Sequence, residues 1–242
     1  MEFDVRSTTL VFSNPLKMKN IITSALFIIL CIPAISQTGL HIGGMFMPQA
    51  TWLLNEDLDG GEFTFGTAYG ATANFHFSDN FGVGADIIVS NEGQRFVNDG
   101  VESTIEVSYL KIPLLIHFNS DPNTSIPFLG EVGIQFSSVT KAKFSVDGEE
   151  FDLTDENGKT IDPEDVFDSS NLGAVLAFGP GFFIGDHLML TTMIRWDLHF
   201  NDAFSDLGRT LYGTDDFKET YPMTVGLRFG LKYTIGDGAG YD

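Results

Sequence analysis

The feature that most constrains the fold is a strict alternation of apolar and polar residues, clearest near the end of the chain. Between 221 and 235 every odd position is apolar, whereas the even positions carry Pro222, Thr224, Gly226, Arg228, Gly230, Lys232 and Thr234. Successive side chains of a β-strand point to opposite faces, so a period of two indicates a strand with one apolar and one polar face. We therefore expect a strand at 221–235.

The same alternation recurs in seven earlier segments. It is nearly as regular at 105–118, where Leu110, Ile112, Leu114, Ile116 and Phe118 share a face, and at 188–200. Weaker alternation defines five more segments, at roughly 39–53, 65–78, 80–91, 125–143 and 171–185. The total of eight is even, as in bacterial single-chain barrels.

The connections between these segments alternate in length. The long ones lie near 54–64, 92–103, 145–170 and 201–219, and the short ones at 78–80, 119–124 and 185–187. An up-and-down barrel with long external loops and short periplasmic turns requires this alternation. It also predicts that both termini lie on the periplasmic side.

The polar face decides between a membrane barrel and a soluble one. A soluble lipocalin-like barrel, which turns its apolar face inward around a ligand, needs a polar face dense in charge. Here that face is largely Gly, Thr, Ser, Ala and Met, and its few charges are Asp86, Lys111, Glu131, Lys141, Arg195, Asp197, Arg228 and Lys232. We therefore predict an all-β fold, an eight-stranded antiparallel up-and-down transmembrane β-barrel of a Gram-negative outer membrane. The soluble lipocalin-like ligand-binding barrel is the alternative.

The N-terminal region has the pattern of an export signal. Residues 18–36 join a basic start to an apolar run of about a dozen residues, which is too short to span a bilayer comfortably, and end in small residues. We expect cleavage after Ser36, with 1–17 as an upstream extension, 37–236 as the barrel and 237–242 as a short tail. The only cysteine, Cys31, lies within the signal, so the mature chain has no thiol.

The charge balance excludes one class of partner. Without residues 1–36 the chain keeps 10 of its 13 basic and 31 of its 33 acidic residues, a net charge of −21. Phosphate backbones require a basic surface, so nucleic-acid binding is not expected.

Residues 109–115 read YLKIPLL. This segment resembles the fourth strand of the PorT-like outer-membrane barrels of Bacteroidetes, a group of small barrels of the OmpA/OmpX type. The resemblance extends over 37–236 through the Gly-rich segment 171–184, the closing segment 225–233 and a signal ending in Ser-Gln. It implies an outer-membrane barrel, usually of undefined function and in some members associated with secretion machinery. The chain departs from the usual aromatic ending of such barrels, and Tyr233 is the candidate for that role.

Charged residues on the inward face are the first candidate site. Asp86, Glu131 and Asp197 share that face with four bases, which are Lys111, Arg195, Arg228 and Lys232. An eight-stranded barrel has room only for side chains inside, and buried charges must pair. We expect a lumen plugged by ion pairs; a narrow conduit is the alternative.

The third long connection is the second candidate. Residues 145–170 hold ten carboxylates and one lysine. A possible cation-binding loop comprises Asp152, Asp155, Asn157, Asp162 and Glu164, but Leu153 and Ile161 occupy positions where an EF-hand requires oxygen ligands. Specific calcium binding is therefore disfavoured against loosely bound divalent cations, bridging to lipopolysaccharide or a solvated acidic loop.

Catalysis has little support. Asp197, His199 and Ser205 are close in sequence, but nothing in their spacing orients a base toward a nucleophile, and the five histidines show no metal spacing. No catalytic residues, no confident metal site and no cofactor are expected.

Outward aromatics near strand ends are typical of interfacial girdles. In this sequence they are Tyr69, Phe75, Phe77, Phe81, Trp196, Phe200, Tyr221 and Tyr233.

The function we expect is a structural or binding one, exerted by acidic external loops on outer-membrane lipid, lipopolysaccharide or an external or secretion-machinery protein. The alternatives are a small low-conductance channel and a lipid-modifying barrel enzyme.

Overall fold

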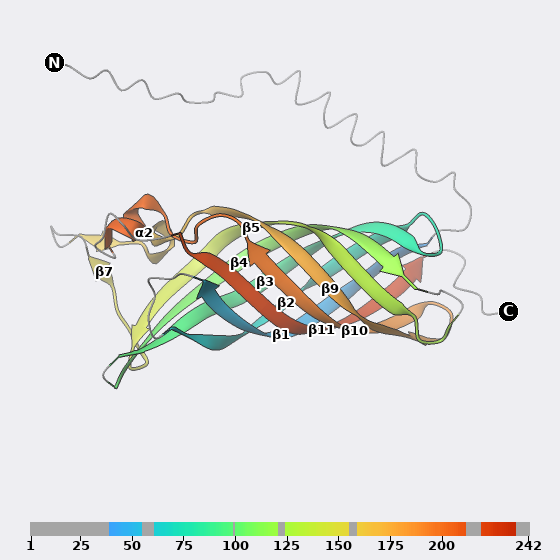
Figure 1. The fold of residues 1–242 in the computed structure, drawn as a ribbon, viewed down its shortest axis with the longest axis horizontal. Coiled ribbons are helices and arrows are strands. Elements are labelled where there is room, and N and C mark those ends of the chain that lie inside the picture. The colour runs from blue at the N-terminus through green and yellow to red at the C-terminus, as the bar shows by residue number, and fades with distance from the viewer. Residues whose placement is uncertain are drawn as a thin grey trace, which may run out of the picture. The chain divides into compact units, whose positions relative to one another are not determined.

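The computed structural model describes residues 39–54, 61–98, 100–120, 124–154, 159–211 and 219–235. Eight long antiparallel strands make up the barrel in Figure 1. They are β1 (Leu40–Leu54), β2 (Gly61–His76), β3 (Phe81–Asn98), β4 (Val101–Asn119), β5 (Phe128–Val146), β9 (Ser170–Ile184), β10 (Leu188–His199) and β11 (Tyr221–Ile235). The expected signal peptide, upstream extension and C-terminal tail lie outside the described residues.

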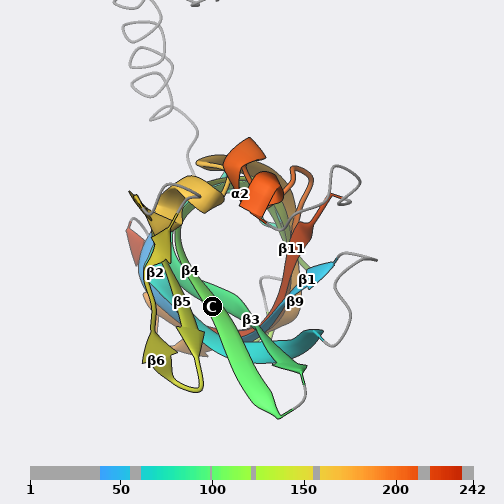
Figure 2. The same ribbon diagram turned by 90° about the vertical axis from the view of Figure 1, so that its left-hand side faces the viewer.

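The strands close into a ring in which each long strand pairs with its neighbours in sequence. β1 pairs with β2 on one side and with β11 on the other, and β4 pairs with β5. The closing pair runs from Leu40 opposite Ile235 to Leu54 opposite Tyr221. Figure 2 looks along this ring. The prediction of an eight-stranded up-and-down barrel is confirmed.

The two faces of each strand differ as the alternation predicts. On β11, Leu227 and Leu231 are 41% and 49% exposed on the outer wall, while Arg228 between them is 2% exposed. The exposed apolar side chains recur on all eight strands, as expected for a wall in contact with lipid. Among the described residues, no helix has the length and apolar character needed to cross a membrane.

The connections define two ends of the barrel. The turn end holds 77–80, 120–127 and 185–187, together with the first residue of β1 and the last of β11; the loop end holds the other four connections. The connection expected at 119–124 is therefore longer. Ile126, expected at the start of a strand, precedes β5 and is 57% exposed.

The prediction of a long connection at 92–103 is wrong. β3 and β4 continue through this segment and pair up to Asn98 opposite Val101. The turn contains Gly100 at φ +85°, a conformation that glycine adopts without a steric penalty. The alternation persists here in polar form, with Glu92 and Gln94 buried inside the barrel. The sequence of this segment is nevertheless typical of a loop, because its inward residues are polar.

A β-bulge in β5 overturns the expected position of Lys141. Ser108 of β4 pairs with Lys141, but Tyr109 pairs with Val139, so Thr140 is an extra residue. Thr140 and Lys141 are both exposed, and the next residue, Ala142, is buried. One extra residue reverses the alternation from that point, so Lys141 belongs to the outer wall and not to the lumen.

Short elements occupy the remaining loop-end connections. β6 (Glu149–Glu150) pairs with the end of β5, and β7 (Leu153–Thr154) pairs with β8 (Thr160–Ile161). The 3₁₀-helix η2 (Pro163–Val166) precedes β9, and the helix α2 (Asp206–Leu211) lies between β10 and β11. Figure 2 shows η2 and α2 at the rim of the ring.

Candidate functional site

The lumen holds a charge-balanced set of buried side chains. Among the described residues the buried acids are Asp86, Glu92, Glu131 and Asp197, and the buried Lys and Arg residues are Lys111, Arg195, Arg228 and Lys232. Each is at most 6% exposed. Four negative charges therefore face four positive ones, with histidines counted as neutral.

Arg195 of β10 is the centre of the set. Its Nε donates to Asp197 Oδ1 at 2.7 Å, and its Nη2 donates to Gln135 Oε1 at 2.9 Å. Its Nη1 lies 3.5 Å from Asp86 Oδ2. Asp86 belongs to β3, which stands opposite β10 in the ring. Side chains from opposite walls therefore meet at this level of the lumen.

The ion pairs continue toward the turn end through Arg228. Its Nη1 lies 3.8 Å from Asp86 Oδ2, and its Nη2 donates to Glu131 Oε1 at 2.6 Å. The same Glu131 oxygen lies 3.4 Å from Lys232 Nζ and 3.2 Å from His117 Nδ1. One carboxylate of β5 thus contacts three basic side chains from β4 and β11.

The pairs continue toward the loop end through Lys111. Its Nζ lies 3.3 Å from Asp197 Oδ2 and also pairs with Glu92. Glu92 Oε1 accepts a hydrogen bond from Ser90 Oγ at 2.7 Å, and Ser90 Oγ accepts one from Gln49 Nε2 at 2.9 Å. We call the connected set from His117 to Gln49 the lumen ladder.

The lumen ladder is balanced for a physical reason. A buried charge that loses its partner typically costs about 3–5 kcal/mol, because it keeps the desolvation penalty without the compensating attraction. The seven charged residues expected from the sequence comprise three acids and four bases, and the structure brings all seven together. Glu92 supplies the fourth acid.

An apolar cluster lies beyond the ladder at the loop end. Val166 of η2 and the neighbouring Phe167 and Phe204 are 1%, 3% and 3% exposed. The Phe167 ring stacks on Phe204 at 5.4 Å and on Phe144 of β5 at 5.9 Å between centroids. We call this cluster the apolar cap; its buried members are Ile105, Val107, Tyr109, Ala142, Phe144, Ile161, Val166, Phe167, Ala203 and Phe204.

The connections at 145–170 and 201–219, expected as plain loops, thus contribute to a core. The sequence signal is short: Val166-Phe167 and Ala203-Phe204 are isolated apolar pairs in polar surroundings. Ile105 and Val107 are a further signal, because they are apolar at inward positions. Phe167 and Phe204 also form an isolated β-bridge, which ties the two connections together.

Only three of the five residues of the possible cation-binding loop lie within the described residues. Asp155 and Asn157 lie outside the described residues. Asp152 and Asp162 are exposed and Glu164 is half-buried. Within the described residues, no group of three or more His, Cys, Asp or Glu side chains is placed to hold a metal ion.

The three candidate residues for catalysis, Asp197, His199 and Ser205, do not form a site. His199 Nε2 lies 3.4 Å from Ser137 Oγ inside the barrel. The hydroxyl of Ser205 instead donates to the backbone oxygen of Asp165 at 2.6 Å, within the loop-end connections. Asp197 is engaged by Arg195 and Lys111 in the lumen ladder.

Three histidines that are far apart in sequence meet at the turn end. The rings of His41 and His76 are 4.7 Å apart, and those of His76 and His117 are 6.0 Å apart. His41 Nδ1 is hydrogen-bonded to Thr234 Oγ1 at 2.9 Å. The sequence does not reveal this cluster, because it depends on the register of three different strands and the closing strand β11.

Comparisons with known proteins identify a family. Residues 36–237 match the family model described as outer membrane protein beta-barrel domain. A search of curated proteins finds no significant match.

The outer membrane protein OprG from Pseudomonas aeruginosa is 12% identical, with a TM-score of 0.47 over 82% of this chain and 95% of that one. Neisserial surface protein A is 8% identical, with a TM-score of 0.48 over 81% and 97%. Ail, the attachment invasion locus protein of Yersinia pestis, was solved in complex with the heparin analogue sucrose octasulfate. It is 13% identical, with a TM-score of 0.40 over 82% and 97%.

Proposed function

Because the chain belongs to the outer membrane protein beta-barrel family, we propose that it is a closed barrel acting as a structural or binding protein through its acidic external loops. The family places it in the outer membrane of a Gram-negative cell. The observation that carries the proposal is the filled lumen. Side chains from opposite strands meet inside it, so binding is expected at the loop end and not along a central path.

The filled lumen favours this role over that of a small channel. An eight-stranded barrel is just wide enough for its interior to be filled by side chains. Here the ion pairs of Arg195 join β10 to β3 across the ring, and the apolar cap lies on the loop-end side of them. A permeating ion would have to separate charges that are buried and paired, which is costly.

The exposed acidic residues of the loop end supply the binding surface in this proposal. Asp147, Glu149, Glu150 and Asp152 are all exposed. Closely spaced carboxylates repel one another and attract cations. We assign to this surface loosely bound divalent cations that bridge to lipopolysaccharide, or contacts with an external protein partner. A secretion-machinery partner belongs to the same proposal, through the PorT-like resemblance of residues 109–115.

The orientation and the export route complete the proposal. Residues 18–36 serve as a signal peptide, and the turn end, which holds the two terminal strand ends, faces the periplasm. The protein is taken to be non-enzymatic, because His199 and Ser205 have separate partners.

Planar-bilayer recording tests the closed lumen. We expect no reproducible conductance from the purified refolded protein, whereas a general porin in the same membranes conducts. The Phe204→Ala variant, which loosens the apolar cap but leaves the ladder intact, should remain silent as well. Steady single-channel currents from the unaltered protein would refute the closed barrel and favour the channel.

Loop binding is tested separately by crosslinking in native membranes. A variant in which 147–160 is replaced by a short Gly-Ser turn should fold and lose the crosslinked lipopolysaccharide or protein partner. A matched variant with Gly-Ser inserted at 78–80 on the turn end should keep it. Retention of the same partner by the first variant would contradict a role for the acidic loop.

A further inference from the structure

The outer wall has a polar pocket at the loop-end edge of its apolar band. On β4 the outward residues are apolar from Phe118 to Leu110, and polar at Ser108 and Glu106. On β3 the change falls between Val89 and Asn91. The change from an apolar to a polar outer surface marks the boundary between hydrocarbon and head groups. The pocket at this boundary therefore lies level with lipid head groups.

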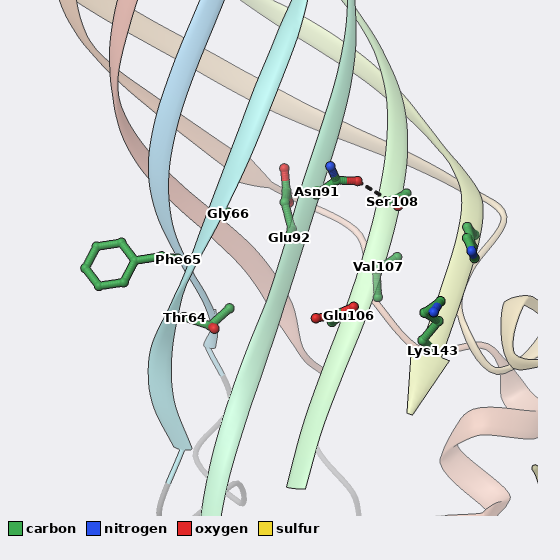
Figure 3. Close-up of a pocket in the computed structure, with 10 residues that line it drawn as sticks. Thr64, Phe65, Gly66, Asn91, Glu92, Glu106, Val107, Ser108 and Lys143 are labelled. Carbon is green, nitrogen blue, oxygen red and sulfur yellow. Dashed lines mark hydrogen bonds between the residues drawn. The ribbon is translucent and has the colours of Figure 1, made fainter. Parts of the chain in front are cut away.

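Irregular strand pairing flanks the pocket. The pairing of β2 with β3 shifts between Phe63 and Thr67, and the bulge at Thr140 interrupts the pairing of β4 with β5. Between these two irregularities lies a hollow of about 380 Å³, within the size range of small-molecule sites. Figure 3 shows its lining; the ten residues are Thr64, Phe65, Gly66, Asn91, Glu92, Glu106, Val107, Ser108, Lys141 and Lys143.

The pocket carries groups that bind hydroxyls. Ser108 Oγ donates to Asn91 Oδ1 at 2.8 Å, as the dashed line in Figure 3 shows. This bond leaves the Asn91 amide nitrogen available as a donor, and Glu106 offers a carboxylate acceptor in the pocket lining. Glu92 is not available, because it is buried and paired with Lys111.

Lys141 supplies a positive charge at the same place. It lies directly opposite Ser108 in the pairing of β4 with β5 and is exposed because of the bulge. Lys143, opposite Glu106, pairs with Glu150. Lys141 has no ion-pair partner among the described residues. A lysine at the edge of an apolar wall extends its ammonium toward the head groups, where phosphate is the abundant anion.

Phe65 is an exposed aromatic at the rim of the pocket. It is 82% exposed and packs edge-on against Phe63 at 5.4 Å between ring centroids. Figure 3 shows its ring projecting away from β2. An aromatic face beside hydroxyl-binding groups fits a ligand with an apolar C–H face and a polar rim, as a sugar ring has.

We propose that this pocket binds the phosphorylated sugar head group of a membrane glycolipid in the leaflet around the loop end. Lys141 contacts the phosphate, Asn91 and Glu106 contact sugar hydroxyls, and Phe65 covers the apolar face of the ring. The pocket is separate from the acidic loop of the proposed function. It depends on that proposal only for which leaflet the loop end faces.

Native mass spectrometry of the folded protein in detergent micelles tests this site. The probes are diphosphoryl lipid A, lipid A stripped of its phosphates, and phosphatidylglycerol. We expect one tightly retained diphosphoryl lipid A, with weaker retention of both other lipids. The Lys141→Gln variant should bind it about tenfold more weakly, the equivalent of one charge-assisted hydrogen bond.

Matched variants make the outcome decisive. Arg95→Gln removes another partly exposed base near the loop end, one that pairs with Glu62 outside the pocket, and should leave binding unchanged. Asn91→Ala is an independent variant of the pocket and should also weaken lipid A binding. Heat-modifiable gel mobility shows whether each variant is folded. Unchanged lipid A binding by both pocket variants would overturn the site.

Two competition results would also overturn the assignment. Phosphatidylglycerol that competes as well as lipid A would exclude recognition of the sugar, and inorganic phosphate that displaces lipid A would reduce the site to a free-anion site. Because micelles have no sidedness, these results are independent of membrane orientation and of the conductance and loop-crosslinking experiments.

Discussion

At the scale of single residues, burial in the lumen is decided by which charges find partners. Lys111 is 1% exposed and is shared between Asp197 and Glu92. The sequence could not assign Glu92 to this set, because a polar stretch with a glycine at 93 is typical of a loop. Charge balance is the signal that could have found it: the four bases of the candidate lumen set exceed its three acids by one.

The Glu92→Gln substitution should destabilise the barrel by about 2 kcal/mol, because it removes one of two anionic partners from a buried lysine. Urea-dependent unfolding in lipid vesicles, followed by gel mobility, measures this loss. Glu106→Gln is the same chemical change on the exposed outer face and should stay within about 0.5 kcal/mol of the unaltered protein. Equal losses for the two variants would show that Glu92 has no special role inside the barrel.

At the scale of elements, the strands were predictable wherever one face is continuously apolar. The segment 221–235 coincides with β11, and the other predicted strands overlap their counterparts. Prediction failed where the rule of alternation breaks. A bulge leaves no mark in composition, so the alternation alone assigns Lys141 to the lumen although it lies on the outer wall. The contacts of Phe167 with Phe204 join connections that are distant in sequence, and the short apolar pairs that contain these residues do not reveal that the two pack together.

The bulge suggests a deletion experiment. Thr140 and Lys141 both face outward, so removal of Thr140 restores plain alternation without turning any other residue to the wrong face. We expect this deletion to give a folded, heat-modifiable barrel. Deletion of Gln135 from the regular part of β5 should instead prevent folding, because the residues between it and the bulge would exchange lipid-facing and lumen-facing positions. Equal folding yields for the two deletions would contradict the assigned register.

At the scale of the whole molecule, the two ends of the barrel differ in kind. The turn end has three short connections, whereas the loop end has extended strands, the apolar cap and most of the exposed acidic residues that the structure describes. The sequence predicted this asymmetry through connection length. It could not predict that β3 and β4 would themselves extend to the loop end, because their inward residues there are polar.

Proteolysis of intact cells tests the proposed orientation. Protease added outside should cleave within 147–160 and spare 77–80, because the proposed orientation exposes only the loop end to the medium. The same protease added to opened cells should gain access to the turn end. Cleavage at 77–80 in intact cells would reverse the orientation and assign the acidic loops to the periplasm.

The pairing of the first strand with the last has a consequence for biogenesis. β11 is the last strand in sequence, and it carries Arg228 and Lys232, two of the four buried bases. A chain truncated before β11 would confine four carboxylates with two cations and leave open hydrogen-bonding edges on β1 and β10. Addition of β11 therefore neutralises the charge of the interior and closes the barrel between β1 and β10 in one step. We therefore expect that a chain lacking the final strand does not form a stable barrel, since it lacks both the partner strand and the counter-charges.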